Sequence, residues 1–218
     1  MFQRHSELLN ECMNKIFQAK VLVAGAGGLG CTVLSLLARV GVGNIYLVDG
    51  GIVDEPDLNR QILYDWESLG KPKVHAAKEK LSKINPSCNV VAVEKTIDDS
   101  FSLTEVDVVV DCLDNFRSKL VLDRVCRERS IPLVHAGVEK FTGQVTTILY
   151  GRTPALSELF RGSKDREVSQ IFPPLVSLIA SIQASEVIKL ICGKEETLAG
   201  KILLVDLLNN RFETVRTI

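Results

Sequence analysis

A run of glycines near the amino terminus has the spacing of a phosphate-binding turn. Gly25, Gly27, Gly28 and Gly30 follow the apolar segment 20–24 directly and open an apolar stretch with helical periodicity. Glycines let backbone N–H groups approach a phosphate closely, and the first turn of the following helix favours negative charge. The pattern therefore predicts a strand–loop–helix unit that binds a nucleotide. A tight βα turn without a ligand is the alternative interpretation.

An acid follows the next predicted strand. Asp49 ends the apolar segment 44–48, at the position where a carboxylate can accept hydrogen bonds from ribose hydroxyls. The glycine loop lacks the Gly-Lys-Ser/Thr sequence of a P-loop, which disfavours a Walker-type NTPase. The loop and the acid together predict a nucleotide site of the dinucleotide-binding type.

Two cationic residues are expected at the same edge of the sheet as the glycine loop and Asp49. Arg60 stands in the sequence Asp-Leu-Asn-Arg-Gln, and Lys73 opens the next predicted helix. Both segments follow the carboxyl ends of strands, where ligands bind in this topology. Two fixed cations suit the β- and γ-phosphates of a nucleoside triphosphate, whereas a dinucleotide dehydrogenase does not need them. Ordinary solvated surface charges are the alternative.

A second group of acids follows the fourth predicted strand in the sequence Asp-Cys-Leu-Asp-Asn. Asp111 and Asp114 end that strand, and Asn115 stands beside them. A carboxylate at this edge can hold Mg²⁺ against phosphates, or it can cap the amino terminus of the next helix. His135 ends the fifth predicted strand near the same edge. For His135 we favour an ordinary hydrogen-bonded histidine over a substrate contact.

The elements that must position these residues alternate along the chain. Strands are predicted over 20–24, 44–48, 88–93, 106–112 and 131–136, and helices over 6–18, 29–40, 72–84, 115–129 and 174–191. Residues 145–150 alternate in polarity, residues 201–207 and 211–216 are expected to form a hairpin, and 151–172 are expected to form a long surface loop. The prediction is an α/β, Rossmann-like, mostly parallel sheet flanked by helices, with an antiparallel C-terminal extension.

Composition excludes several classes of protein. The chain has 218 residues and a net charge of −1, which argues against a strongly basic nucleic-acid binder. The apolar stretch 171–192 contains Gln183, Glu186 and Lys189, which favours a buried helix over a membrane span. Six cysteines without a C-x-x-C pair predict free thiols, no structural zinc and a reducing, cytoplasmic location, with no signal peptide at the amino terminus.

Taken together, these segments resemble a known family. The sequences VLVAGAGGLG, LNRQ, GKPK, DCLDN and HAGVEKFTGQV are similar to those of the MoeB/ThiF/HesA adenylyltransferases, which resemble the adenylation domain of ubiquitin-activating enzymes. The resemblance implies a single adenylation domain over 1–218, with a nucleotide-binding half at 1–137 and the extension, crossover loop and last long helix at 138–218. It implies ATP-dependent adenylation of the C-terminal Gly-Gly carboxylate of a small ubiquitin-like sulfur-carrier protein, as in thiamine or molybdopterin biosynthesis, by a homodimer.

The resemblance also implies roles for individual residues. Arg60, Lys73 and Asp114 are the catalytic candidates, and Asp114 is the expected Mg²⁺ ligand with Asn115 beside it. Arg4 is the candidate for an arginine donated to the ATP site of the partner subunit. The remaining assignments are Gly25, Gly27, Gly28 and Gly30 for the phosphate loop, Asp49 for the ribose, and Asn59, Arg60, Gln61 and Lys73 for the phosphates.

Departures from the family pattern leave two alternatives open. Gly51 stands where the family often has a second acid after the ribose acid, and Pro56-Asp57 stands where it often has Ser-Asn. The family's zinc cysteines are missing, and so is the cysteine that some members use to form a bond with the carrier. An NAD-dependent oxidoreductase on the same fold and an ATP-binding scaffold without chemistry are therefore the competing functions.

Overall fold

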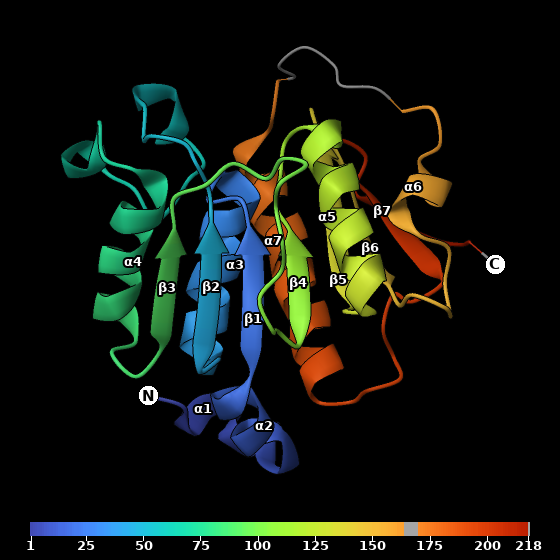
Figure 1. Ribbon diagram of the computed structural model, residues 1–218, viewed down its shortest axis with the longest axis horizontal. Helices are drawn as coiled ribbons and strands as arrows, with labels where there is room; N and C mark the ends of the chain where they lie inside the picture. Colours follow the sequence, from blue (N-terminus) through green and yellow to red (C-terminus); the bar gives the residue numbers. More distant parts are fainter. Residues whose placement is uncertain (164–169, 218) are drawn as a thin grey trace.

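Eight strands form one sheet in the part of the chain that the computed structural model describes, residues 1–163 and 170–217 (Figure 1). Their order across the sheet is β3-β2-β1-β4-β5-β6-β7-β8. The bounds are β1 Lys20–Ala24, β2 Asn44–Val48, β3 Asn89–Val93, β4 Val108–Asp111, β5 Leu133–Glu139, β6 Thr142–Ile148, β7 Lys201–Asp206 and β8 Arg211–Arg216. The strand order reverses between β1 and β4, because β2 and β3 follow β1 on one side and β4 lies on the other; ligands bind at such a switch point in open α/β sheets.

The first five strands are parallel, as their short apolar sequences predict. β1 pairs with β2 on one side and with β4 on the other, both in parallel register. Val21, Leu22 and Val23 of β1 are almost completely buried, because helices cover both faces of this part of the sheet. The prediction of a mostly parallel, Rossmann-like sheet is confirmed.

Helices cover the two faces of the sheet unequally, as Figure 1 shows. One face packs against α3 (Gly28–Val40), α4 (Lys73–Ile84) and α7 (Pro173–Ile191), and these elements share the larger apolar core. The other face packs against α5 (Phe116–Arg129), α6 (Leu156–Leu159) and apolar residues of the segment 94–107, which form a second core. The two cores hold the loops at the carboxyl ends of β1, β2 and β4 on a rigid base.

The second half of the sheet is antiparallel, as predicted. β5, β6, β7 and β8 pair in sequence with antiparallel register. β6 spans Thr142–Ile148 and therefore begins three residues before the predicted 145–150, because β5 continues to Glu139 and turns tightly into it. β8 lies at the edge of the sheet, and all its residues are exposed.

Two local predictions need correction. The predicted helix 6–18 is broken into α1 (Gln3–Ser6), the 3₁₀ helix η1 (Asn10–Cys12) and α2 (Met13–Gln18), and Leu8 between them is 85% exposed. The predicted loop 151–172 contains the short helix α6. Residues 164–169 of that loop lie outside the described residues.

α7 is long and apolar enough to cross a membrane by length and composition, and it is the one such helix in the described residues. Its polar side chains, however, have partners inside the protein. Gln183 Nε2 donates to the carbonyl oxygens of Asp111 and Val134, and Glu186 Oε2 accepts from Thr147 Oγ1. A helix packed on a sheet in this way is a core helix, as its sequence predicts.

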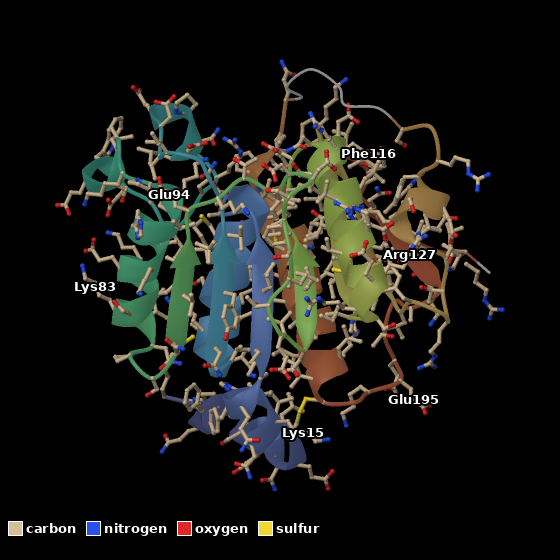
Figure 2. All side chains as sticks on the ribbon, viewed as in Figure 1. Lys15, Lys83, Glu94, Phe116, Arg127 and Glu195 are labelled. Carbon is tan, nitrogen blue, oxygen red and sulfur yellow. A yellow bond between two sulfur atoms is a disulfide. The ribbon has the colours of Figure 1, made fainter. Side chains whose placement is uncertain are left out.

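The prediction that the cysteines are free is wrong for one pair. Cys12, at the start of α2, forms a disulfide with Cys192 at the end of α7, and the two Cα atoms are 5.3 Å apart. Figure 2 shows this bond in yellow near the labelled Lys15. Cys192 is half-buried rather than buried. The pairing was not predictable from spacing because 180 residues separate the two cysteines.

Candidate active site

The glycine loop joins β1 to α3 in a conformation that only glycine fits. Gly25 has a φ of +99°, and a Cβ there would lie 2.6 Å from the carbonyl oxygen of Cys112. A Cβ on Gly30 would lie 1.9 Å from the carbonyl oxygen of Gly25, so α3 begins in direct contact with the loop. The loop therefore presents its backbone at the N-terminus of α3, the geometry that binds phosphate.

Asp49 ends β2 beside this loop. Its Oδ2 accepts a hydrogen bond of 2.7 Å from the backbone N–H of Ala26, and its Oδ1 accepts one of 2.6 Å from the N–H of Gly51. Two backbone donors fix the orientation of the carboxylate, and each oxygen retains a second lone pair. Each oxygen of Asp49 can therefore accept a further hydrogen bond from a ligand beside the glycine loop.

Tyr64 connects the loop to α4 and was not predicted from the sequence. Its hydroxyl lies 2.9 Å from the carbonyl oxygen of Ala26 and 3.1 Å from that of Lys73. Burial and the nearby Cys31 raise the pKa of Tyr64 well above its ordinary value, so the hydroxyl keeps its proton. The buried phenol holds the first residue of α4, Lys73, at a fixed position relative to the glycine loop.

The two predicted cations come from different elements and lie near the glycine loop and the end of β2. Arg60 follows the 3₁₀ helix η2 (Glu55–Asp57), and its Cγ lies 3.3 Å from the position that a Cβ on Gly28 would occupy. Lys73 begins α4, and its Cδ lies 3.5 Å from the Cβ position of Gly51. The structure thus places Arg60 beside the glycine loop and Lys73 beside the turn that follows Asp49.

A carboxylate that sequence reasoning gave no role lies between these cations. Asp57 Oδ2 is 3.0 Å from Lys73 Nζ, and Asp57 Oδ1 is 3.8 Å from an Arg60 guanidinium nitrogen. Gln61 Nε2 donates to Asp57 Oδ1 at 2.5 Å, while the buried Oε1 of Gln61 has no hydrogen-bond partner. Asn59 is exposed, and its Oδ1 accepts from Arg60 at 2.9 Å.

Asp114 and Asn115 follow β4 at the same edge, close to the start of α5, where Figure 2 labels Phe116. Asn115 is the N-cap of α5, because its Oδ1 accepts from the N–H of Ser118 at 2.8 Å. The capping alternative therefore applies to Asn115 rather than to Asp114. The Asp114 side chain is exposed, and its Oδ1 accepts from Asn115 Nδ2 at 3.2 Å.

A lone carboxylate is compatible with Mg²⁺ in a phosphate site. Residues 1–163 and 170–217 contain no group of three or more His, Cys, Asp or Glu side chains that could hold a metal ion. Mg²⁺ in such sites is held by one or two carboxylates, with water and substrate phosphates as the other ligands. Asp114 fits that pattern, with an exposed carboxylate and a neighbouring amide.

Comparison with known proteins shows the family of the chain. The sequence matches the ThiF family over residues 3–218. The chain belongs to the ThiF family. It is 35% identical to the SAMP-activating enzyme E1 of Haloferax volcanii over 98% of this chain and 83% of that protein. It is 34% identical to the molybdopterin-synthase adenylyltransferase of Escherichia coli, over 91% of this chain and 83% of that protein.

Two further similarities agree with this membership of the ThiF family. The chain is 37% identical to the heterocyst HesA protein of Trichormus variabilis over 91% of its length and 76% of that protein. The fold superimposes on a crystal structure of E. coli MccB with a TM-score of 0.91, covering 99% of this chain and 70% of MccB at 23% identity. The resemblance to the MoeB/ThiF/HesA family is confirmed, and the chain is an adenylyltransferase of that family.

In this ThiF-family chain, Asp111 is buried under the site instead of facing it. Lys119 Nζ lies 3.0 and 3.1 Å from its two oxygens, and His135 Nδ1 lies 2.7 Å from Oδ2. Burial opposes ionisation, but the Lys119 charge and the His135 hydrogen bond hold the pKa of Asp111 below its ordinary value. Burial lowers the pKa of His135, so the imidazole is neutral and donates from Nδ1.

The buried group formed by Asp111, Lys119 and His135 explains why a histidine stands at this position, which the sequence predicts to lie near the carboxyl ends of the strands. The prediction of an ordinary hydrogen-bonded histidine is confirmed, but His135 does not end its strand, because β5 continues to Glu139; its partner, Asp111, was not predicted. Lys119 also donates to the carbonyl oxygen of Ala136, and Asp111 Oδ1 accepts from the N–H of Leu113 at 3.1 Å. The buried charges thereby fix the start of the loop that leads to Asp114.

Arg4 is the one predicted site residue that the structure keeps apart from the others. It is exposed on α1, and Figure 1 shows α1 and α2 at the amino ends of the strands, opposite to the glycine loop. Within a single copy of this ThiF-family chain, Arg4 therefore does not reach the site that contains Arg60 and Lys73.

Proposed function

We propose that the protein uses ATP to adenylate the C-terminal carboxylate of a small ubiquitin-like sulfur-carrier protein that ends in Gly-Gly, forming an acyl-adenylate and pyrophosphate. The names of its relatives support this substrate class, since they include a SAMP-activating enzyme E1 and molybdopterin-synthase adenylyltransferases. Carriers of molybdopterin or thiamine biosynthesis are the first candidates.

The observation that carries the proposal is the placement of two cations around one carboxylate, Asp57, beside the glycine loop and Asp49. Arg60 packs against Gly28, and Lys73 packs against Gly51 beside Asp49. A nucleoside triphosphate brings several negative charges to a short stretch of the site, and two fixed cations complement them. Tyr64 and Asp57 hold these cations in place before any ligand is bound.

The roles of the residues follow from their positions. The glycine loop would bind phosphate oxygens through backbone N–H groups, and Asp49 would accept from the ribose. Arg60 and Lys73 would bind the phosphates together with Asn59 and Gln61. Asp114 would hold Mg²⁺, which would neutralise phosphate charge and stabilise the departing pyrophosphate.

No general base is required for this reaction. The nucleophile is a carboxylate, which is already ionised at neutral pH. Its attack on the α-phosphate is opposed mainly by electrostatic repulsion, which the cations of the site reduce. The absence of a proton-transfer step agrees with the neutral, buried His135 lying under the site rather than in it.

The proposal includes an organisation for the whole chain. Residues 1–218 would form a single adenylation domain that works as a homodimer in the cytoplasm and needs neither nucleic acid nor a membrane. The continuous eight-stranded sheet and the packing of α7 on it support the single domain. We also predict that the purified protein contains no structural zinc.

Carrier-dependent exchange of labelled pyrophosphate into ATP tests the proposed reaction. The purified protein is incubated with Mg·ATP, labelled pyrophosphate and several small proteins, each with and without its terminal Gly-Gly. We expect exchange with at least one intact carrier and none with its truncated form. ATP binding without exchange for any carrier would favour the inactive scaffold, and NADH binding without ATP binding would favour the oxidoreductase.

A further inference from the structure

Asp57 places a negative charge among the groups proposed to bind the triphosphate. Its carboxylate contacts Lys73 Nζ at 3.0 Å and Gln61 Nε2 at 2.5 Å, and it lies 3.8 Å from Arg60. The Asp57 side chain is 14% exposed and the Lys73 side chain 15% exposed, so water screens this pair only in part. An anionic ligand must therefore share these cations with a carboxylate of the protein itself.

Most of the contacts of Asp57 do not require its charge. Oδ2 also accepts from the backbone N–H of Asp54, and this contact closes the capping box of η2. An asparagine keeps one carbonyl oxygen, which can accept from the N–H of Asp54, and its amide can donate to the otherwise unpartnered Oε1 of Gln61 once the Gln61 amide turns over. The contacts that depend on the negative charge are the ion pair with Lys73 at 3.0 Å and the longer one with Arg60 at 3.8 Å.

The position of this acid differs from the family pattern described above. The family often carries a second acid at the position of Gly51, and a Cβ there would lie 3.5 Å from Lys73 Cδ. An acid at position 51 would therefore extend from the Asp49 segment along the Lys73 side chain. In this chain the acid beside Lys73 comes from position 57, on the segment that also carries Arg60 and Gln61.

We propose that Asp57 is an internal counter-ion that competes with the triphosphate for Lys73 and thereby makes nucleotide binding selective for the Mg²⁺ complex. A metal-free triphosphate is repelled by Asp57 with its full charge. The Mg²⁺ complex carries two fewer negative charges and is repelled less. The inference rests on the proposed use of ATP, and it assigns Asp57 a specificity-determining role in that site.

Isothermal titration of ATP against the wild-type protein and Asp57→Asn, in EDTA and then in excess Mg²⁺, tests this inference. We expect Asp57→Asn to bind metal-free ATP about tenfold more tightly, because one repulsive charge is removed and Lys73 is released. The Mg²⁺ complex should gain clearly less. Glu55→Gln is the matched control, since it removes one charge from an exposed residue of the same segment, and it should leave both affinities unchanged.

A double-mutant cycle shows whether Asp57 acts through Lys73. In the Lys73→Met background no Lys73 ion pair can be released, so the gain from Asp57→Asn should fall below tenfold, to the part that comes from direct repulsion and from the weaker contact with Arg60. An equal gain in both backgrounds would overturn the inference, and so would equal affinities of wild type and Asp57→Asn for metal-free ATP.

Carrier-dependent exchange, measured on the same preparations, separates the two proposals. If the wild-type protein catalyses exchange but Asp57→Asn shows no selective gain in EDTA, only the role of Asp57 is wrong. If no variant binds ATP under either condition, the proposed function fails and the role of Asp57 fails with it.

Discussion

Arg60 and Lys73 show how a common glycine loop acquires a defined ligand class. The loop alone is compatible with many nucleotides, because its backbone N–H groups recognise a phosphate and nothing else. Lys73 is anchored through its carbonyl oxygen by Tyr64, and its ammonium is oriented by Asp57. Two oriented cations favour a triphosphate over a dinucleotide, which has fewer charges to neutralise in the same space.

Asp114→Ala should remove most of the reaction rate without affecting the fold. If Asp114 holds Mg²⁺, its loss should lower carrier-dependent exchange about a hundred- to a thousandfold, the usual effect of losing one transition-state contact. Its side chain is exposed, so we expect a change in the free energy of unfolding within about 0.5 kcal/mol. Glu128→Ala, at the other end of α5, is the control for both measurements. Near wild-type exchange by Asp114→Ala would rule out the metal role.

His135 should make stability depend on pH. Its pKa is lowered by burial, so below a pH of about 6.5 the unfolded chain binds a proton that the folded protein excludes. The free energy of unfolding should therefore decrease as the pH falls from about 7 to 5, by at most about 1.4 kcal/mol per unit for this group. His135→Asn keeps an N–H donor toward Asp111 and should flatten this dependence.

Urea denaturation of wild type and His135→Asn at a series of pH values measures the difference. Asp111 contributes little in this window, because its lowered pKa keeps it ionised until the pH falls below its ordinary range. The same slope in both proteins would mean that His135 takes up a proton inside the folded protein.

The residues that sequence reasoning identified and those it missed differ in one respect. Asp49 and the glycines follow strands at fixed spacing, so their positions depend on local geometry alone. The roles of Asp57, Tyr64 and Lys119 depend on partners that lie at least 8 residues away in the sequence. Folding is what brings these partners into contact. A pattern of residue types along the chain contains no information on such pairs.

At the level of elements, the parallel strands were predictable because burial on both faces requires continuous apolar runs. The structure of the amino-terminal segment was not predictable, because a few apolar residues at helical spacing do not show whether all of them are buried on one face of a helix. Leu8 is exposed while Met13 and Ile16 are buried, and the helix is interrupted at Leu9 with a φ of −108°. The helix α6 is a single turn whose N–H groups at Leu156 and Ser157 are held by Asp123.

The disulfide between α2 and α7 should contribute measurably to stability. A cross-link between residues 180 positions apart restricts the unfolded chain strongly, and native disulfides typically contribute about 2 to 4 kcal/mol. We expect a reducing agent, or Cys12→Ser, to lower the urea midpoint accordingly. The reducing agent should have no further effect on Cys12→Ser, which makes this variant the control for reduction itself.

Counting thiols checks the bond directly. Alkylation of the unfolded protein should modify four cysteines before reduction and all six afterwards. Cytosolic thiol pools keep most such pairs reduced, so protein extracted under thiol-blocking conditions also tests the proposed location. Alkylation of all six cysteines before reduction would show that Cys12 and Cys192 are free thiols in solution.

At the scale of the whole molecule, different residues lie at the carboxyl ends and at the amino ends of the parallel strands. The glycine loop, Asp49 and Asp114 lie at the carboxyl ends of the parallel strands, while the amino-terminal helices lie at the opposite ends (Figure 1). The class of fold was predictable because alternating strands and helices allow few topologies. The relation between separate copies was not, because surface complementarity leaves no periodic pattern in one sequence.

Arg4 provides the test of the proposed homodimer. It lies on α1, at the end of the sheet away from its own glycine loop, so it can assist catalysis only in another copy of the chain. Arg4→Ala and Asp114→Ala should each be inactive as homodimers if both residues are required. In a mixed dimer, one site combines the intact Asp114 of one subunit with the intact Arg4 of the other.

Co-expression of the two variants with different tags, followed by purification on both tags, isolates the mixed dimer. Its carrier-dependent exchange should reach about half that of the wild-type dimer, because one of two sites is complete. Co-expression of Arg60→Ala with Asp114→Ala is the control, since both residues belong to the site of their own chain and each site remains defective. An inactive mixed dimer, or full activity of Arg4→Ala alone, would show that Arg4 takes no part in the site of a partner.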